Sequence, residues 1–233
     1  DGPNPAIKFQ RQRERWFKRE YIKNFQIDPT EYKISDINTN FDDKVINSLH
    51  EFFTEITHNC KYLRAKEILY STFYSPGEAE HKYFDVFRSL KKDKKWKKNQ
   101  LHAIYTRDND LIFLALQFID EHFIVIKDFQ TIIDISILRD LLFYLIFQKD
   151  MLFSAQDLSK KPNCISIARE FSEHIPSDLK QQIINDIIGL SFIIGNDFLP
   201  PFPDASKSFS LNSLLDSYKA INQDFFDKIV SNS

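Results

Sequence analysis

Short strand-like runs alternate with helix-like runs between residues 67 and 194, and this alternation limits the possible folds of the chain more than any other feature. The runs predicted as strands are rich in β-branched and aromatic residues, and they span 67–74, 103–106 and 123–127. The predicted helices have apolar residues at helical spacing and span 41–60, 78–90, 111–120, 135–147 and 177–194. The pattern predicts an α/β fold, a mostly parallel sheet flanked by helices.

Composition limits the class of protein further. Of the 233 residues 42% are hydrophobic, which excludes a disordered chain, and the net charge of −2 gives no hint of a polyanionic partner. No apolar run reaches the roughly 18 residues of a transmembrane helix, so we expect no membrane association. Cys60 and Cys164 lie far apart without further ligands nearby. We therefore expect an intracellular protein, with nucleus and cytoplasm both open.

Acidic residues recur where ligands gather in open α/β sheets, beyond the carboxyl ends of strands. One acidic pair follows the first predicted strand, and another follows the second. A single acid follows the last long helix, and another is residue 1. If the sheet closes as expected, these carboxylates converge. In chain order they are Asp1, Glu78, Glu80, Asp108, Asp110 and Asp197.

Converging carboxylates repel each other and stay ionised only when cations hold them. Sites with oxygen ligands alone suit Mg²⁺ or Mn²⁺, and two such ions about 4 Å apart serve phosphodiester cleavage. For any single pair the alternative is ordinary helix capping. Recurrence at three element ends favours a metal-dependent nuclease.

Residues 6–24 contain no helix breaker and predict a basic helix, with seven basic residues against two acidic ones. Lys8, Gln12 and Arg15 are spaced i, i+4 and i+7, so they share one face. Two cations and an amide on one face can hold a phosphate by charge-assisted hydrogen bonds. The alternative is a solvated basic surface helix.

Four motifs resemble those of the eukaryotic 5′→3′ exoribonucleases, in the family's order. Residues 75–82, SPGEAEHK, are similar to the family's Pro-Gly-Glu-Gly-Glu-His-Lys, and residues 108–112, DNDLI, to its Asp-Ala-Asp-Leu-Ile. Residues 195–200 match its Gly-Asn-Asp-Phe-Leu-Pro. The opening residues 1–17 resemble its Asp-Gly-Val-Ala-Pro segment and the Gln-Arg-x-Arg-Arg-Phe that follows.

The resemblance implies a 5′→3′ exoribonuclease that degrades single-stranded, 5′-monophosphorylated RNA to mononucleotides by two-metal hydrolysis with Mg²⁺ or Mn²⁺. The six acids named above correspond to the family's metal-site residues. Lys8, Gln12 and Arg15 correspond to its 5′-phosphate pocket, and His81 and Asn196 are candidates for a supporting contact behind the ligands. The implied fold has a PIN/flap-nuclease-like core.

The sequence also departs from the family pattern. Trp16 stands where the family has a second arginine, which removes one phosphate ligand, and Ala79 and Pro201 replace a glycine and a histidine. The family's domain begins upstream, with a strand bearing another metal-binding Asp. We therefore expect a single nuclease domain over residues 1–233, incomplete at its N-terminal end, with the phosphate helix at 6–24 and the acidic α/β core at 65–200.

Two other interpretations remain beside this one. A flap-type endonuclease shares the acidic core, but its last acid is followed by a glycine-rich motif, and no glycine follows Asp197 here. A catalytically impaired homologue or fragment acting as an RNA-binding or interaction module is the alternative from another class. The lysine-rich residues 91–98 fit either an RNA-tracking patch or a solvated turn.

Overall fold

The structure is a computed structural model that describes residues 13, 43–59, 68–72, 74–93, 97, 100–128, 130–147, 163–195, 199, 202 and 211–224. The chain divides into two compact units, residues 1–92 and 93–233, and each is considered by itself. Apart from Arg13, the predicted helix at 6–24 lies outside the described residues. The prediction of one nuclease domain stays a prediction.

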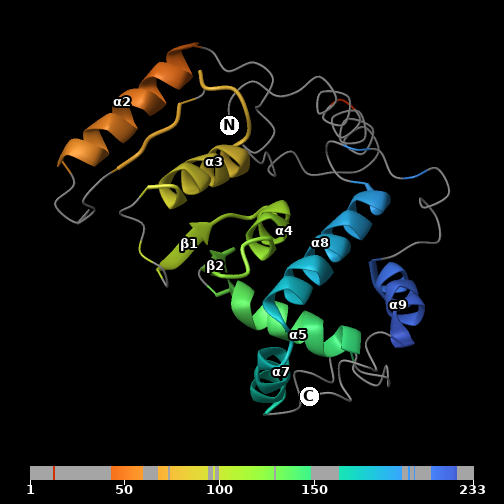
Figure 1. The fold of residues 1–233 in the computed structure, drawn as a ribbon. Coiled ribbons are helices and arrows are strands. Elements are labelled where there is room, and N and C mark those ends of the chain that lie inside the picture. Colours follow the sequence, from red (N-terminus) through yellow and green to blue (C-terminus); the bar gives the residue numbers. More distant parts are fainter. Residues whose placement is uncertain are drawn as a thin grey trace. The chain divides into compact units, whose positions relative to one another are not determined.

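In the first unit the described residues form helices α2 (Asp43–Asn59) and α3 (Ala79–Lys91), drawn in orange and yellow in Figure 1. Both were expected from the spacing of their apolar residues. Phe84 and Phe87 of α3 and Ile46 of α2 are buried as expected, whereas Leu49, Phe52 and Phe53, expected on the buried face of α2, are exposed. The two predicted helices are therefore confirmed.

The predicted strand at 67–74 is wrong for residues 68–72, which lie in neither strand nor helix. Tyr70 packs instead on the side chains of α2. Its ring stacks on His50 with centroids 5.6 Å apart and lies 5.5 Å from the ring of Phe53. A run of aromatic residues can pair as a strand or pack on a helix. Here Tyr70 packs on helix α2.

The second unit contains a three-stranded sheet in the order β1 (Leu101–Tyr105), β2 (His122–Ile126) and β3 (Ile132–Asp134). β1 and β2 are parallel, with Leu101 opposite His122, whereas β2 and β3 are antiparallel. The short turn between β2 and β3 permits only an antiparallel hairpin. The described sheet is therefore mixed, and the third strand was not expected.

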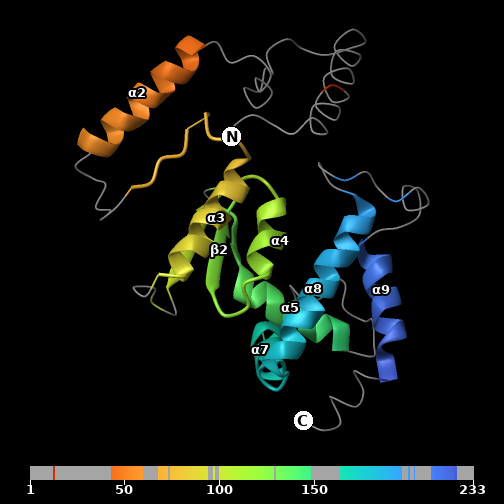
Figure 2. The same cartoon turned by 45° about the horizontal axis from the view of Figure 1, so that its top comes forward.

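Helices surround this sheet in the order α4 (Asp110–Leu116), α5 (Ile135–Phe147), α7 (Cys164–Glu173), α8 (Ser177–Ile194) and α9 (Leu211–Ile221). The bounds of α5 and α8 are those expected, α4 is shorter than expected, and α7 and α9 were not expected. α4 and α5 pack against β2, where Phe123 and Val125 are fully buried. Figures 1 and 2 show α8 beside α9 and α5 beside α7.

Arg139 of α5 explains why α4 ends early. This arginine is only 4% exposed, and its guanidinium donates to the carbonyl oxygens of Phe118 (2.9 Å) and Glu121 (2.8 Å). Burial lowers the pKa of Arg139, and the nearby carboxylates Asp140 and Asp134 act against that shift. The cation thus satisfies two carbonyl groups of the turn between α4 and β2.

Asp134 begins α5. Its Oδ1 accepts hydrogen bonds from the Ser136 hydroxyl (2.5 Å) and from the backbone N–H groups of Ser136 (2.9 Å) and Ile137 (3.2 Å), and its Oδ2 from His122 (3.0 Å). Burial acts to raise the pKa of Asp134, but these hydrogen bonds lower it to about 2. The carboxylate is an N-cap that also joins β2 to β3.

The C-terminal helix α9 is held by two polar contacts. The Tyr218 hydroxyl donates to Asp186 of α8 (2.8 Å), and the Lys219 ammonium donates to the Leu145 carbonyl of α5 (3.4 Å). Burial and Asp186 both raise the pKa of Tyr218. No helix in the described part of the chain is long and apolar enough to cross a membrane.

We expect Arg139→Met to lower the free energy of unfolding by about 2 kcal/mol, because the Glu121 carbonyl loses its guanidinium donor while the Phe118 carbonyl still accepts from the Glu121 N–H. Urea denaturation measures the loss. Arg169→Met is the matched control: its side chain is 54% exposed and forms a 3.6 Å ion pair with Asp140, so the loss should stay below about 1 kcal/mol. Equal losses would contradict the role assigned to Arg139.

We expect Asp134→Ala to destabilise the protein by about 1 kcal/mol at pH 7 through loss of the cap. The folded-state pKa lies below the ordinary value of about 3.9, so the contribution is present above about pH 4 and is lost as the pH falls towards 2. Denaturation at a series of pH values should therefore show the two proteins converging in acid. A difference independent of pH would contradict this account.

Candidate active site

A tight turn leads into α3 and presents the first acidic pair. Gly77 has φ of +100°, a left-handed conformation that side chains rarely adopt, so glycine is required. The Ser75 N–H and the Lys82 ammonium both donate to the Thr72 carbonyl, each at 3.2 Å. The turn is thus tied to the segment before it, and α3 begins directly after Glu78.

Glu78 and Glu80 lie at the N-terminus of α3, and Glu78 is only 6% exposed. Glu80 is half-buried, and within the described part of the structure its Oε2 is buried and accepts no hydrogen bond. Burying a carboxylate oxygen without a donor is costly, and a hard cation compensates that cost. These two residues therefore fit a divalent metal ion. His81, the next residue, is exposed.

The second acidic pair lies on the loop from β1 to α4, at the carboxyl end of β1. The Asp108 N–H donates to the Thr106 hydroxyl (3.0 Å), and Asp108 Oδ1 accepts from the Asp110 N–H (3.1 Å). Asp108 is exposed, and Asp110 is half-buried as the first residue of α4. One oxygen of Asp108 is thus occupied within the loop.

A lysine that was not expected in the site lies beside this second pair. The Lys127 ammonium donates to Oδ1 of Asn109, the residue between the two aspartates. Lys127 directly follows β2, and the Thr106 N–H donates to the Ile126 carbonyl (2.9 Å), which aligns the two strand ends. In the sequence, only its place directly after a predicted strand could have indicated that Lys127 lies near this loop.

The predicted site residues are thus only partly placed. Glu78 and Glu80 belong to the first unit and Asp108 and Asp110 to the second, so the convergence of the pairs stays a prediction. Among the described residues, no three His, Cys, Asp or Glu side chains form a metal-binding group. The remaining predicted residues lie outside the described ranges: Asp1, Lys8, Gln12, Arg15, Asn196 and Asp197.

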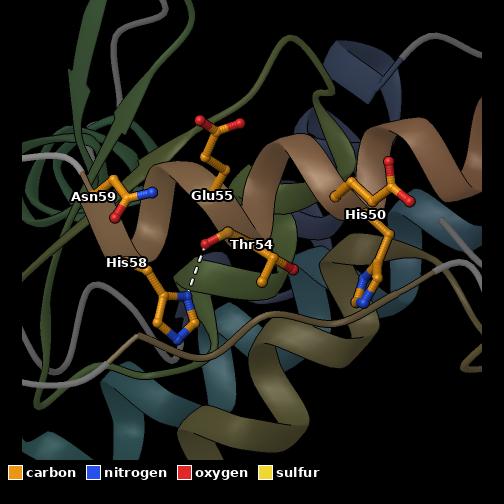
Figure 3. Close-up of a pocket in the computed structure, with 6 residues that line it drawn as sticks. His50, Thr54, Glu55, His58 and Asn59 are labelled. Carbon is orange, nitrogen blue, oxygen red and sulfur yellow. Dashed lines mark hydrogen bonds between the residues drawn. The ribbon is translucent and has the colours of Figure 1, made fainter.

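An open groove of about 510 Å³ lies elsewhere, along α2 of the first unit. Figure 3 shows His50 and His58 on the same side of the helix and Glu55 pointing away from them. The His58 Nδ1 donates to the Thr54 carbonyl (2.8 Å), which closes a local helical contact. The described lining contains none of the predicted site residues, and we assign the groove no catalytic part.

Comparison with curated proteins finds several similar chains. The 5′-3′ exoribonuclease 1 of Saccharomyces cerevisiae is 31% identical over 70% of this chain and 11% of its own length. The 5′-3′ exoribonuclease 2 of Debaryomyces hansenii is 34% identical over 59% of the chain and 15% of its own length. The Homo sapiens 5′-3′ exoribonuclease 1 is 26% identical over 87% of the chain and 12% of its own length. The chain thus spans less than a sixth of these relatives.

A family model described as the XRN 5′-3′ exonuclease N-terminus matches residues 1–129. This range contains both described acidic pairs, the predicted basic helix and Lys127. It covers more than half of the 233 residues. The chain therefore belongs to the XRN 5′-3′ exonuclease family, within its N-terminal region.

Proposed function

We propose that the protein containing this chain is a 5′→3′ exoribonuclease that degrades single-stranded RNA with a 5′-monophosphate to mononucleotides. The family match over residues 1–129 carries the proposal, because that range contains five of the six predicted acids and the predicted basic helix. The relatives named above are 5′-3′ exoribonucleases. We also propose a PIN-like nuclease core.

We propose that two Mg²⁺ or Mn²⁺ ions are held by the acidic residues of the family motifs. When bound, two such ions stabilise the attacking and leaving oxygens of an in-line displacement at phosphorus. The buried Oε2 of Glu80 supports this assignment, because it accepts no hydrogen bond within the described part of the chain. The proposed ligands are Asp1, Glu78, Glu80, Asp108, Asp110 and Asp197.

The chain's own residues supply rigid ligand placement and substrate binding. The Gly77 turn fixes the start of α3, and the Asp110 N–H orients the Asp108 carboxylate from within its loop. The proposed ligand groups are thereby held before metal or substrate arrives. Lys8, Gln12 and Arg15 would bind the terminal phosphate, and His81 and Asn196 would support the ligands from behind.

The first test is RNA degradation by the full-length protein. We expect RNA with a 5′-monophosphate to be shortened from its 5′ end in Mg²⁺, and RNA with a 5′-hydroxyl to be degraded much more slowly. Asp108→Asn should lower kcat/KM by about 100-fold or more, since loss of a direct ligand exceeds the 10- to 100-fold typical of outer contacts. Labelled 5′ and 3′ ends distinguish the direction.

Asp216→Asn is the matched control for that test, because Asp216 is an exposed residue of α9 outside the proposed site. It should leave the rate unchanged. Equal degradation of both RNAs without a divalent metal would overturn the proposal. Binding of RNA without cleavage by the full-length protein would favour the non-catalytic, RNA-binding alternative.

The second test is metal-dependent stability. We expect Mg²⁺ to raise the melting temperature of the wild-type protein relative to EDTA, because a ligand that binds only the folded state stabilises it. Glu80→Gln should abolish most of this increase, whereas Glu55→Gln on the exposed side of α2 should retain it. A full increase in Glu80→Gln would remove Glu80 from the proposed ligand set.

A further inference from the structure

The bond from Lys127 to Asn109 joins two elements that the proposed chemistry brings together. Lys127 follows β2, whereas Asn109 lies between Asp108 and Asp110 on the loop after β1. In a parallel pair the carboxyl ends of both strands lie at the same edge of the sheet. A side chain that follows one strand can therefore reach the loop that follows the other. The bond thus ties the acidic loop to a neighbouring strand.

Lys127 is itself held firmly. Its N–H donates to the Thr131 carbonyl (3.0 Å) across the turn between β2 and β3. Asp128 Oδ1 closes the same turn by accepting from the N–H groups of Gln130 (2.8 Å) and Thr131 (2.7 Å). These bonds fix the backbone of Lys127 at the end of β2, from which its side chain reaches Asn109.

Asn109 has no other described role for its side chain. It is the N-cap residue of α4, yet its side chain makes no capping hydrogen bond, and only its backbone carbonyl accepts from the Ile112 N–H (3.0 Å). Its amide oxygen instead accepts a hydrogen bond from the Lys127 ammonium.

We propose that Lys127 is a positioning residue: through Asn109 it holds the loop bearing Asp108 and Asp110 in the shape that binds a divalent cation. The inference rests on the proposed function, since those aspartates are proposed metal ligands.

The test measures metal binding and activity separately in the full-length protein. Calorimetry with Mn²⁺ alone gives the affinity, and RNA degradation over a range of Mg²⁺ gives the half-saturating concentration and KM for RNA. We expect Lys127→Ala and Asn109→Ala each to weaken both metal measures about tenfold, as outer contacts to ligands typically do. KM for RNA should change little.

Three further variants separate positioning from general damage to the fold. The double variant should be no worse than either single variant, because both remove the same bond. Lys127→Arg should restore most of the Mn²⁺ affinity, since arginine keeps the charge and a donor. Asn185→Ala on α8, which removes an acceptor for the Gln181 amide (3.1 Å), should have no effect on metal binding.

Each result decides between the two proposals. Metal-dependent degradation with unchanged metal constants in both single variants would overturn the role of Lys127 and leave the proposed function standing. Losses that multiply in the double variant would also overturn it, because Lys127 would then act independently of Asn109. If the variants bind Mn²⁺ more weakly but the wild-type protein degrades no RNA, the positioning role of Lys127 is supported and the proposed exoribonuclease function is overturned. A wild-type protein that binds no Mn²⁺ would overturn the role.

Discussion

The parallel pairing of β1 and β2 is the constraint on which the rest of the second unit depends. The register that sets Leu101 opposite His122 continues past the strands through the bond from Thr106 to Ile126. It therefore brings the loop after β1 and the first residue after β2 to the same edge. The contact between Lys127 and Asn109 exists only because of that alignment.

At the opposite edge of the sheet, where β2 begins, a buried arginine keeps the surrounding elements in place. Arg139 supplies donors to the turn that ends α4, while the loop with Asp108 and Asp110 begins the same helix. The short helix is thus held at both ends, by α5 at one and by β2 at the other. Such a short helix has little stability of its own, so these contacts determine where its acidic end lies.

Much of the fold could be predicted, because long apolar runs that end at polar residues mark the boundaries of buried helices. The bounds of α5 and α8 follow directly from their runs of isoleucine and leucine. The prediction of secondary structure failed where the packing of side chains outweighs the local preference of the residues for a strand or a helix. Tyr70 lies on α2 rather than in a strand, and α7 and α9 were not predicted although both helices are amphipathic. The short β3 depends on its hairpin partner.

The sequence by itself determined the family motifs, the acidic pairs and the glycine turn before α3, because these features follow from residue types at short spacing. Only the tertiary structure decided that Glu80 Oε2 is buried, that Arg139 ends α4 and that Lys127 contacts Asn109. The last contact joins residues 18 positions apart. No local pattern encodes it, since it depends on how two strands pair and not on the preference of either residue.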